Sequence, residues 1–381
     1  MLKISPEVLK WAITTANLKE EDIIKKLNIS KKKLDEWLSG KKIPTFNELE
    51  KLSKITKREI SLFFLDRPPQ EPRMLLDYRL GKHNELSIKS LEIIRRIKYF
   101  QKEIHNLYVE TNKSLPPKIE YFNLNISPVD VASKYRNILR INKEIISEKN
   151  LKDEKIFDLL KKKIEQLNII ILNVPIPEED GIKGFSLSDL EPYIIVINKS
   201  DEFIKSKIFT LLHEFAHLIL KQGNGFCNPE ILDSGHEDIM KLERWCNIFA
   251  SHFLMEKIKD EELIVLKNGK TINDVDEIIK KLSEKFHLSK SALYITLYQD
   301  GILKKEILNE YFKKEYVPVG KKFKRRPKEY KKVLEEYGEK TIKTIFEAKD
   351  EGYITTNDVL TLLSIKVKDY EMVRSFVNSR E

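Results

Sequence analysis

The sequence predicts an α+β protein that is mostly helical and has one small β-sheet. Two observations support this class. Apolar residues recur with the helical period of 3.6 residues along most of the 381-residue chain. Only residues 169–198 contain the short β-branched runs that are typical of buried strands. We therefore expect few strands, with helices supplying most of the core.

The first 65 residues predict a bundle of short helices. Glu20–Leu27 and Lys31–Leu38 are both amphipathic, and Asn28-Ile29-Ser30 forms a turn whose serine can cap the second helix. Ser39-Gly40 ends that second helix. A short helix, a three-residue turn and a second helix are the pattern of a helix-turn-helix. We expect this domain to span residues 1–66.

The middle of the chain follows a proline-rich segment and predicts helices, then strands. The helices are expected at Ile88–Asn112, Pro128–Leu139 and Lys152–Leu167, and the strands at Ile169–Val174, Gly184–Leu187 and Tyr193–Asn198. Ser200 or Asp201 can cap the helix that follows. From its order along the chain, the third strand could pair with an extended peptide by β-addition.

The remainder of the chain predicts helices only. They are expected at Lys241–Met255, Asp274–Phe286 and Lys290–Asp300, followed by a final helical unit in Lys328–Glu381. We place the second and third domains at residues 67–315 and 316–381.

The most informative stretch is His213-Glu214-Phe215-Ala216-His217, an H-E-x-x-H pentad in an apolar run without Gly or Pro. On a helix, His213 and His217 project from the same face, so their imidazoles can bind one Zn²⁺. Glu214 can then act as general base on a water molecule. The alternative interpretation is a core helix with two hydrogen-bonded histidines.

A catalytic zinc site needs a third protein ligand. The metzincin spacing fails, because position 220 is leucine and position 223 is glycine. Glu243, on a following apolar helix, is the best candidate, and Asn247 one turn later could orient a ligand imidazole. Four residues before that helix are alternatives to Glu243: Glu230, Asp233, His236 and Glu237.

The composition excludes two classes of protein. The two cysteines, Cys227 and Cys246, argue against a disulfide-stapled secreted protein. Charged residues interrupt every apolar run well short of a membrane span, and the N-terminus lacks an apolar signal core. We expect a cytoplasmic protein without membrane association. The formal net charge of +9 permits an acidic partner such as nucleic acid.

Several motifs make the chain resemble bacterial and phage regulators that join an Xre-type helix-turn-helix to an ImmA/IrrE-type metallopeptidase domain. They are Phe63–Pro69, Asp77-Tyr78-Arg79, Gly184–Leu187, Phe209–His217, and Glu243–Ala250 with Leu254-Met255. The resemblance covers nearly the whole chain. Two departures are Cys246, where the family usually has Ala, and Glu256, where Pro is typical; neither is expected to disturb the site.

The resemblance implies a gluzincin-like peptidase with His213, His217 and Glu243 as zinc ligands and Glu214 as catalytic base. It implies a protein substrate, usually a DNA-binding repressor that is cut to switch on stress or mobile-element genes. The chain could also form a homodimer. The rival interpretation is a non-proteolytic DNA-binding regulator or antitoxin in which zinc is structural or sensory.

DNA binding is a separate expectation. Lys31, Lys32 and Lys33 begin the second helix of the predicted helix-turn-helix and suit DNA phosphates. Two acidic residues on the same helix are unfavourable near DNA. Residues 1–65 contain 14 Lys or Arg and 9 Asp or Glu, a difference of +5. The alternative is a protein-interaction domain.

Overall fold

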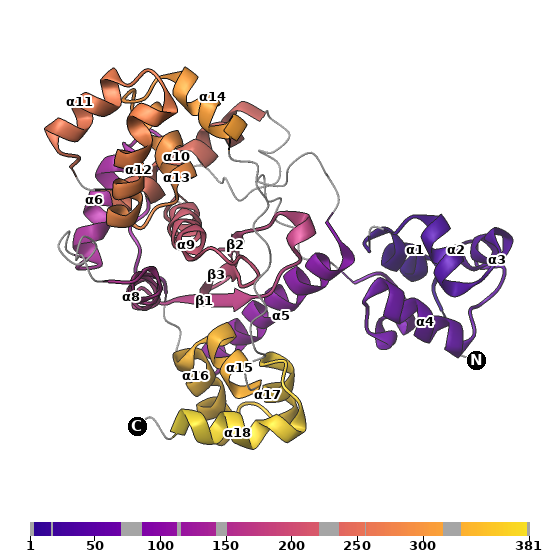
Figure 1. Cartoon of the computed structure of the whole chain (residues 1–381). Helices are drawn as coiled ribbons and strands as arrows, with labels where there is room; N and C mark the ends of the chain where they lie inside the picture. The colour runs from indigo at the N-terminus through magenta and orange to yellow at the C-terminus, as the bar shows by residue number, and fades with distance from the viewer. Residues whose placement is uncertain are drawn as a thin grey trace. The chain divides into compact units, whose positions relative to one another are not determined.

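A computed structural model describes residues 4–16, 18–69, 86–112, 116–141, 151–220, 236–255, 257–314 and 329–378. Helices predominate in these ranges, and their one sheet has three strands (Figure 1), in agreement with the predicted α+β class. The chain divides into two compact units. Unit 1 comprises Met1–Phe100 and Ile176–Ile182, and unit 2 comprises Gln101–Pro175 and Lys183–Glu381. The domain boundaries at 66/67 and 315/316 stay predictions.

Unit 1 contains the predicted bundle of short helices. Its elements are α1 (Pro6–Thr14), α2 (Glu20–Leu27), α3 (Lys31–Leu38), α4 (Phe46–Thr56), the 3₁₀ helix η1 (Ile60–Phe64) and the first part of α5 (Ile88–Glu110). Leu34, Trp37 and Phe63 belong to their shared apolar core. Asn28 ends α2 in the left-handed conformation, with φ 54°, which Asn tolerates better than most residues. The Ser30 hydroxyl caps α3 by accepting a hydrogen bond from the Lys33 amide.

The same turn recurs in unit 2, between α12 (Ile272–Phe286) and α13 (Lys290–Gln299). His287 takes the left-handed conformation with φ 54°, and the Ser289 hydroxyl accepts a hydrogen bond from the Ala292 amide. Most of α13 is buried or half-buried. This local geometry is therefore compatible with a second helix that is packed into the protein rather than presented to a partner.

The sheet of unit 2 has the strand order β1 (Ile169–Val174), β3 (Tyr193–Asn198), β2 (Gly184–Leu187). β3 is parallel to β1 and antiparallel to β2. Because β3 is central and paired on both sides, the prediction that it adds an extended peptide is wrong. The two outer edges of the sheet belong to β1 and β2.

Helix α9 (Ile204–Ile219) packs against β2, β3, α8 (Asp153–Glu165) and α10 (His236–Leu254). It is buried on nearly every side, as expected of a helix that is apolar around its circumference. The predicted cap is wrong, because Phe203 occupies the N-cap position and makes no side-chain cap. Asp201 instead accepts hydrogen bonds from the Phe203 amide and the Ser206 hydroxyl.

The remaining helices complete unit 2. They are α6 (Pro128–Ile138), α11 (Asp260–Asn268), α14 (Lys305–Lys314), α15 (Glu329–Tyr337), α16 (Glu339–Asp350), α17 (Thr356–Leu362) and α18 (Val367–Asn378). Helices α11 and α14 were not predicted from the sequence. Over the described ranges, every helix falls short of the length or the apolarity that a bilayer span requires.

Candidate metal centre

Two helices bring three potential metal ligands together. His213 and His217 lie one turn apart on α9, with their Nε2 atoms 3.0 Å from each other. Glu243 on α10 lies across from them, with Oε2 3.2 Å from His213 Nε2 and Oε1 3.2 Å from His217 Nε2. One ligand atom from each residue lies within 4.8 Å of the others. The three residues come from positions up to 30 apart in the chain and converge on one point.

The cluster fits a zinc ion in both donor set and spacing. Metal–ligand distances of about 2.0–2.1 Å in a tetrahedral site place neighbouring ligand atoms roughly 3.3 Å apart. The observed separations of 3.0 and 3.2 Å are close to that value. Two imidazoles and one carboxylate are also a donor set of catalytic zinc sites, which leave a further position open. The residues can therefore hold a zinc ion.

Asn247 orients the first histidine. Its Oδ1 lies 2.8 Å from His213 Nδ1, so this ring nitrogen can donate a hydrogen bond to the amide. That tautomer leaves a lone pair on His213 Nε2, the atom that faces Glu243 and His217. His213 is fully buried, which further restricts the ring. The predicted pairing of Glu243 and Asn247 on one helical face thus occurs, with each residue contacting α9.

The electrostatics of the cluster favour a charged carboxylate. Burial alone would raise the pKa of the Glu243 carboxyl, but the neighbouring His213 and His217 outweigh it and hold that pKa well below its usual range. Burial alone would lower the pKa of His217, but Cys246, Glu243 and Glu214 outweigh it and hold that pKa well above its usual range.

Cys246 belongs to the same environment. Its side chain is fully buried and hydrogen-bonds with His217, and burial raises the pKa of the thiol. This departure from the usual Ala therefore lies beside one of the two histidines, and the expectation that it does not disturb the site stays a prediction.

Glu214 is a buried carboxylate beside the cluster. Only 4% of the residue is exposed, and it is near enough to His217 to raise the pKa of that imidazole. Ser186 on β2 donates a hydrogen bond from its hydroxyl to Glu214 Oε2, at 3.1 Å. A buried carboxylate requires such partners to offset its loss of hydration. Ser186 therefore contributes to the orientation of Glu214.

Gly184 allows β2 to approach α9 closely. A Cβ atom at this position would lie 2.6 Å from the Val196 carbonyl oxygen and 2.7 Å from Thr210 Cγ2. Both distances are shorter than side-chain atoms tolerate, so a larger residue would push the strand away from the helix. The sequence contains one signal of this contact, since Gly184 and Ser186 are small residues on the same face of a strand. It does not say which helix that face meets.

Several of the other predicted site residues lie outside the part of the chain that the structure describes. Glu230, Asp233 and Cys227 lie outside the described residues, as do Asp77-Tyr78-Arg79 and the side chains of His236 and Glu237. Lys31, Lys32 and Lys33 lie in the first turn of α3 in unit 1.

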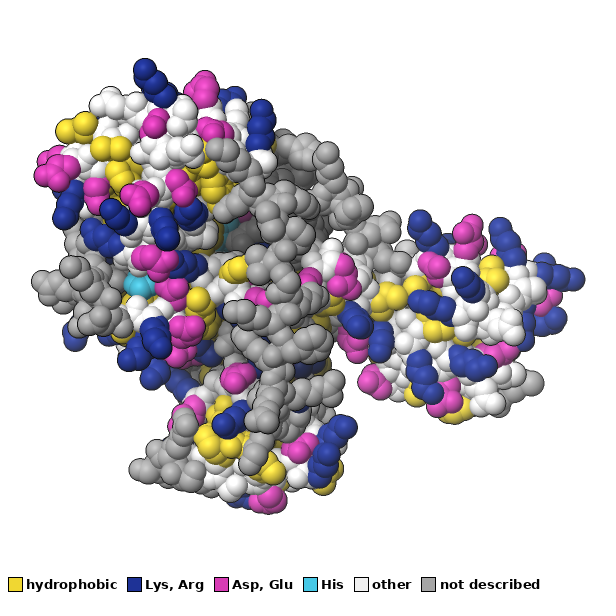
Figure 2. All heavy atoms as spheres, viewed as in Figure 1, with side chains coloured by type: hydrophobic (Ala, Val, Ile, Leu, Met, Phe, Trp, Pro, Cys, Tyr) yellow, Lys and Arg dark blue, Asp and Glu magenta, His cyan; other side chains and the backbone are white. Residues whose placement is uncertain are grey.

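The three lysines are not equivalent. Lys31 and Lys32 are exposed, whereas Lys33 forms an ion pair with Glu48 of α4 and lies over the Trp37 ring. On the visible face of unit 1 in Figure 2, basic and acidic side chains are interspersed. The two exposed lysines are therefore better candidates for phosphate contacts than the third.

The comparison with protein families supports a metallopeptidase. Residues 164–298 match the model of the IrrE N-terminal-like domain, Peptidase_M78, a family of metallopeptidases. The match contains the sheet, α9 and α10, and therefore all residues of the cluster, with Glu214, Ser186 and Asn247. The comparisons with curated proteins and with solved structures gave no match. The similarity over residues 164–298 thus supports a metallopeptidase-type protein.

Proposed function

We propose that the protein is a zinc-dependent endopeptidase that regulates transcription by cutting another protein, a transcriptional repressor. The observation that supports catalysis most directly is Glu214, a buried carboxylate held beside the His213, His217 and Glu243 cluster. A zinc site that only stabilised the fold would have no use for this fourth group. The match to a metallopeptidase family over residues 164–298 points the same way.

The side chains have distinct roles in this proposal. His213, His217 and Glu243 would hold the zinc ion, which when bound would polarise the scissile carbonyl and make a nearby water more acidic. Ser186 donates a hydrogen bond to Oε2 of Glu214, and the Glu214 carboxylate would take a proton from the attacking water. Glu214 then gives that proton to the leaving amine. Asn247 keeps the His213 ring in the tautomer whose Nε2 lone pair faces the cluster.

The substrate is proposed to bind along β2. This strand forms an outer edge of the sheet and contains Ser186, which touches the general base. An extended peptide could add to this edge through main-chain hydrogen bonds. The arrangement would bring the scissile bond close to Glu214, and it replaces β3 with β2 as the strand that receives the peptide.

We also propose that unit 1 binds DNA through α3. The support is the pair of exposed lysines at the start of this helix, Lys31 and Lys32, and the charge difference of +5 over residues 1–65. A repressor substrate bound to DNA would then be near the peptidase.

The peptidase proposal is tested by mapping new protein N-termini in cells that express either the wild type or Glu214→Gln, with and without DNA damage. We expect a fragment that forms only with the wild type and identifies the substrate. Glu262→Gln, at a half-exposed position on α11, serves as the matched control and should cleave like the wild type. The same N-termini in all cells would reject proteolysis and favour the non-proteolytic regulator with a structural or sensory zinc.

A further inference from the structure

The helices at the end of the described chain cover the β1 edge of the sheet. Within unit 2, α15 packs against β1, and Asn173 of this strand donates its side-chain amide to the Glu335 carbonyl at 2.8 Å. Lys199, just after β3, pairs with the Glu335 carboxylate at 2.6 Å. Two separate contacts therefore attach α15 to the same part of the sheet.

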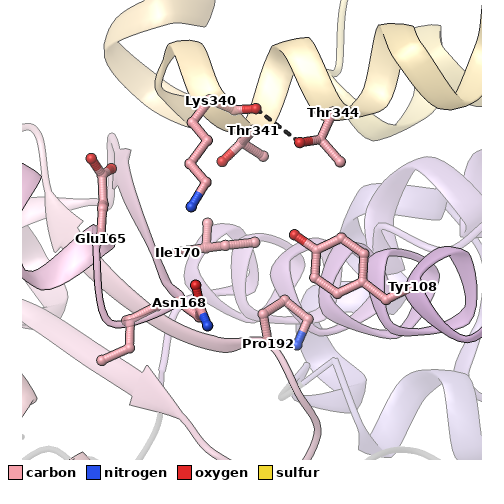
Figure 3. A pocket seen from close by; sticks show the side chains of 9 residues that line it. Tyr108, Glu165, Asn168, Ile170, Pro192, Lys340, Thr341 and Thr344 are labelled. Carbon is pink, nitrogen blue, oxygen red and sulfur yellow. Dashed lines mark hydrogen bonds between the residues drawn. The ribbon is translucent and has the colours of Figure 1, made fainter. Parts of the chain in front are cut away.

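A pocket opens beside this attachment, at the start of β1 (Figure 3). Its cavity volume is about 30 Å³, and the pocket is open to solvent. Lys340 and Thr341 extend into it from the first turn of α16, and the Tyr108 hydroxyl approaches from α5 on the opposite side. Ile170 and Pro192, both buried, provide an apolar surface between them. Donors and apolar groups from four segments thus face one space.

The charges at the pocket do not balance. Glu165 is its carboxylate, and Lys161 Nζ lies 3.8 Å from Glu165 Oε1. Burial raises the pKa of Glu165, while the positive charges of Lys161 and Lys340 oppose this rise. Lys162 also acts on Glu165, and Asp158 acts on Lys161, so three ammonium groups accompany two carboxylates and leave one positive charge in excess. Burial also raises the pKa of Tyr108, so its hydroxyl stays protonated and can donate a hydrogen bond.

We propose that this pocket binds a small organic anion, a carboxylate or phosphate attached to a short apolar group. The oxyanion would accept hydrogen bonds from Lys340, Thr341 and Tyr108, and the apolar group would lie on Ile170 and Pro192. Because α16 and β1 both line the pocket, the bound anion would strengthen the attachment of the last helices to the sheet. The site is distinct from the metal-ligand cluster and does not depend on peptidase activity.

The test measures the melting temperature of the full chain against increasing orthophosphate or isobutyrate, with sodium chloride at matched ionic strength as the reference. We expect at least one of the two anions to give a saturable rise above the chloride reference. The response to each anion distinguishes a phosphate from a carboxylate ligand. If both anions behave like chloride, the proposal is overturned.

Variants locate the site. Lys340→Ala should weaken anion binding about tenfold or more, because it removes a charged hydrogen-bond donor. Lys349→Ala, on the same helix but outside the pocket lining, should leave binding unchanged. Circular dichroism and the melting temperature without anion establish that both variants are folded. Equal binding by the wild type and Lys340→Ala would place the anion elsewhere and reject this pocket.

Hydrogen exchange supplies a second readout on the same samples. The saturating anion should slow exchange at the start of β1 and in the first two turns of α16. Slower exchange elsewhere, with these two segments unchanged, would also reject the pocket.

Discussion

The cluster on α9 and α10 and the lysines at the start of α3 are both small groups of polar side chains, but they differ in burial and in origin. His213, His217 and Glu243 come from two helices and contact one another. Lys31 and Lys32 come from one helix and face solvent. Convergence of polar groups that are buried or half-buried is costly unless a ligand or a partner uses them, so the cluster points to chemistry. Exposed lysines have no desolvation cost. They can contact DNA, another protein or only water, so they do not indicate a particular partner.

The turn before α3 sharpens this difference. It recurs before α13, with the left-handed residue and the serine cap in the same places, yet α13 is largely buried. Local sequence thus determines the turn, and the surroundings determine whether the second helix is available to a partner. We therefore expect substitutions to have large effects at the cluster and small, separable effects at α3.

The largest effect is expected from Glu243→Ala. Removal of one of three protein ligands should weaken zinc binding by more than about 100-fold. This loss is larger than the one expected from substitution of a residue that contacts only a ligand side chain. Zinc content after dialysis against a weak chelator measures it, with Glu262→Ala as the control. Unchanged zinc content in Glu243→Ala would move the third ligand to residues 230–237.

Asn247→Ala should have a smaller effect on the same measurement. Loss of the hydrogen bond to His213 Nδ1 should weaken zinc binding by about 10- to 100-fold, because the ring is no longer held in one tautomer and orientation. Asn247→Asp keeps an acceptor oxygen and should bind zinc more tightly than Asn247→Ala. Equal zinc affinity in both variants would mean that the Asn247 contact does not orient the ring.

Ser186→Ala should separate cleavage from metal binding. Without the hydrogen bond to Oε2, the Glu214 carboxylate is less well oriented. We expect kcat to fall about tenfold, because the positioning of a general base lowers the activation free energy by a few kcal/mol at most. Zinc content should not change. Ser186→Thr retains the hydroxyl and should recover much of the loss, whereas a loss of zinc in Ser186→Ala would show that the serine supports the fold of the site.

The smallest effects are expected in unit 1. Replacing Lys31, Lys32 and Lys33 together should flatten the salt dependence of DNA binding. The double variant Lys31→Ala, Lys32→Ala should alone reduce the slope of log binding constant against log salt concentration by roughly 1.8 in magnitude. Lys33→Ala should change the slope little and instead lower the unfolding free energy by about 0.5 kcal/mol, because it breaks the ion pair with Glu48. An unchanged slope in the triple variant would place DNA on another surface.

The sequence predicts the parts of this structure that depend on local patterns. The helix of His213 and His217, the three strands and the turn at Asn28 follow from periodicity, β-branched runs and capping residues. The pairing of Glu243 with these histidines could be proposed because a zinc site with two histidines needs a third ligand.

The rest depends on tertiary contacts that the sequence does not record. β3 lies in the centre of the sheet, although it comes last of the sheet's three strands along the chain. The contact of Ser186 with Glu214 and the close approach at Gly184 exist only because β2 packs on α9. The pocket at Lys340 combines residues more than 230 positions apart, from Tyr108 to Thr344.

The central claim is that the α9 and α10 cluster is a metal-dependent catalytic site. Its most direct test compares purified wild type and Glu214→Gln for zinc content and for cleavage of the substrate that the N-terminal mapping identifies. We expect equal zinc in both proteins and cleavage by the wild type alone, because Glu214 moves protons and does not hold the metal. Equal cleavage by both proteins would contradict the role of Glu214, and zinc-free wild type that cleaves equally well would contradict a metal-dependent site.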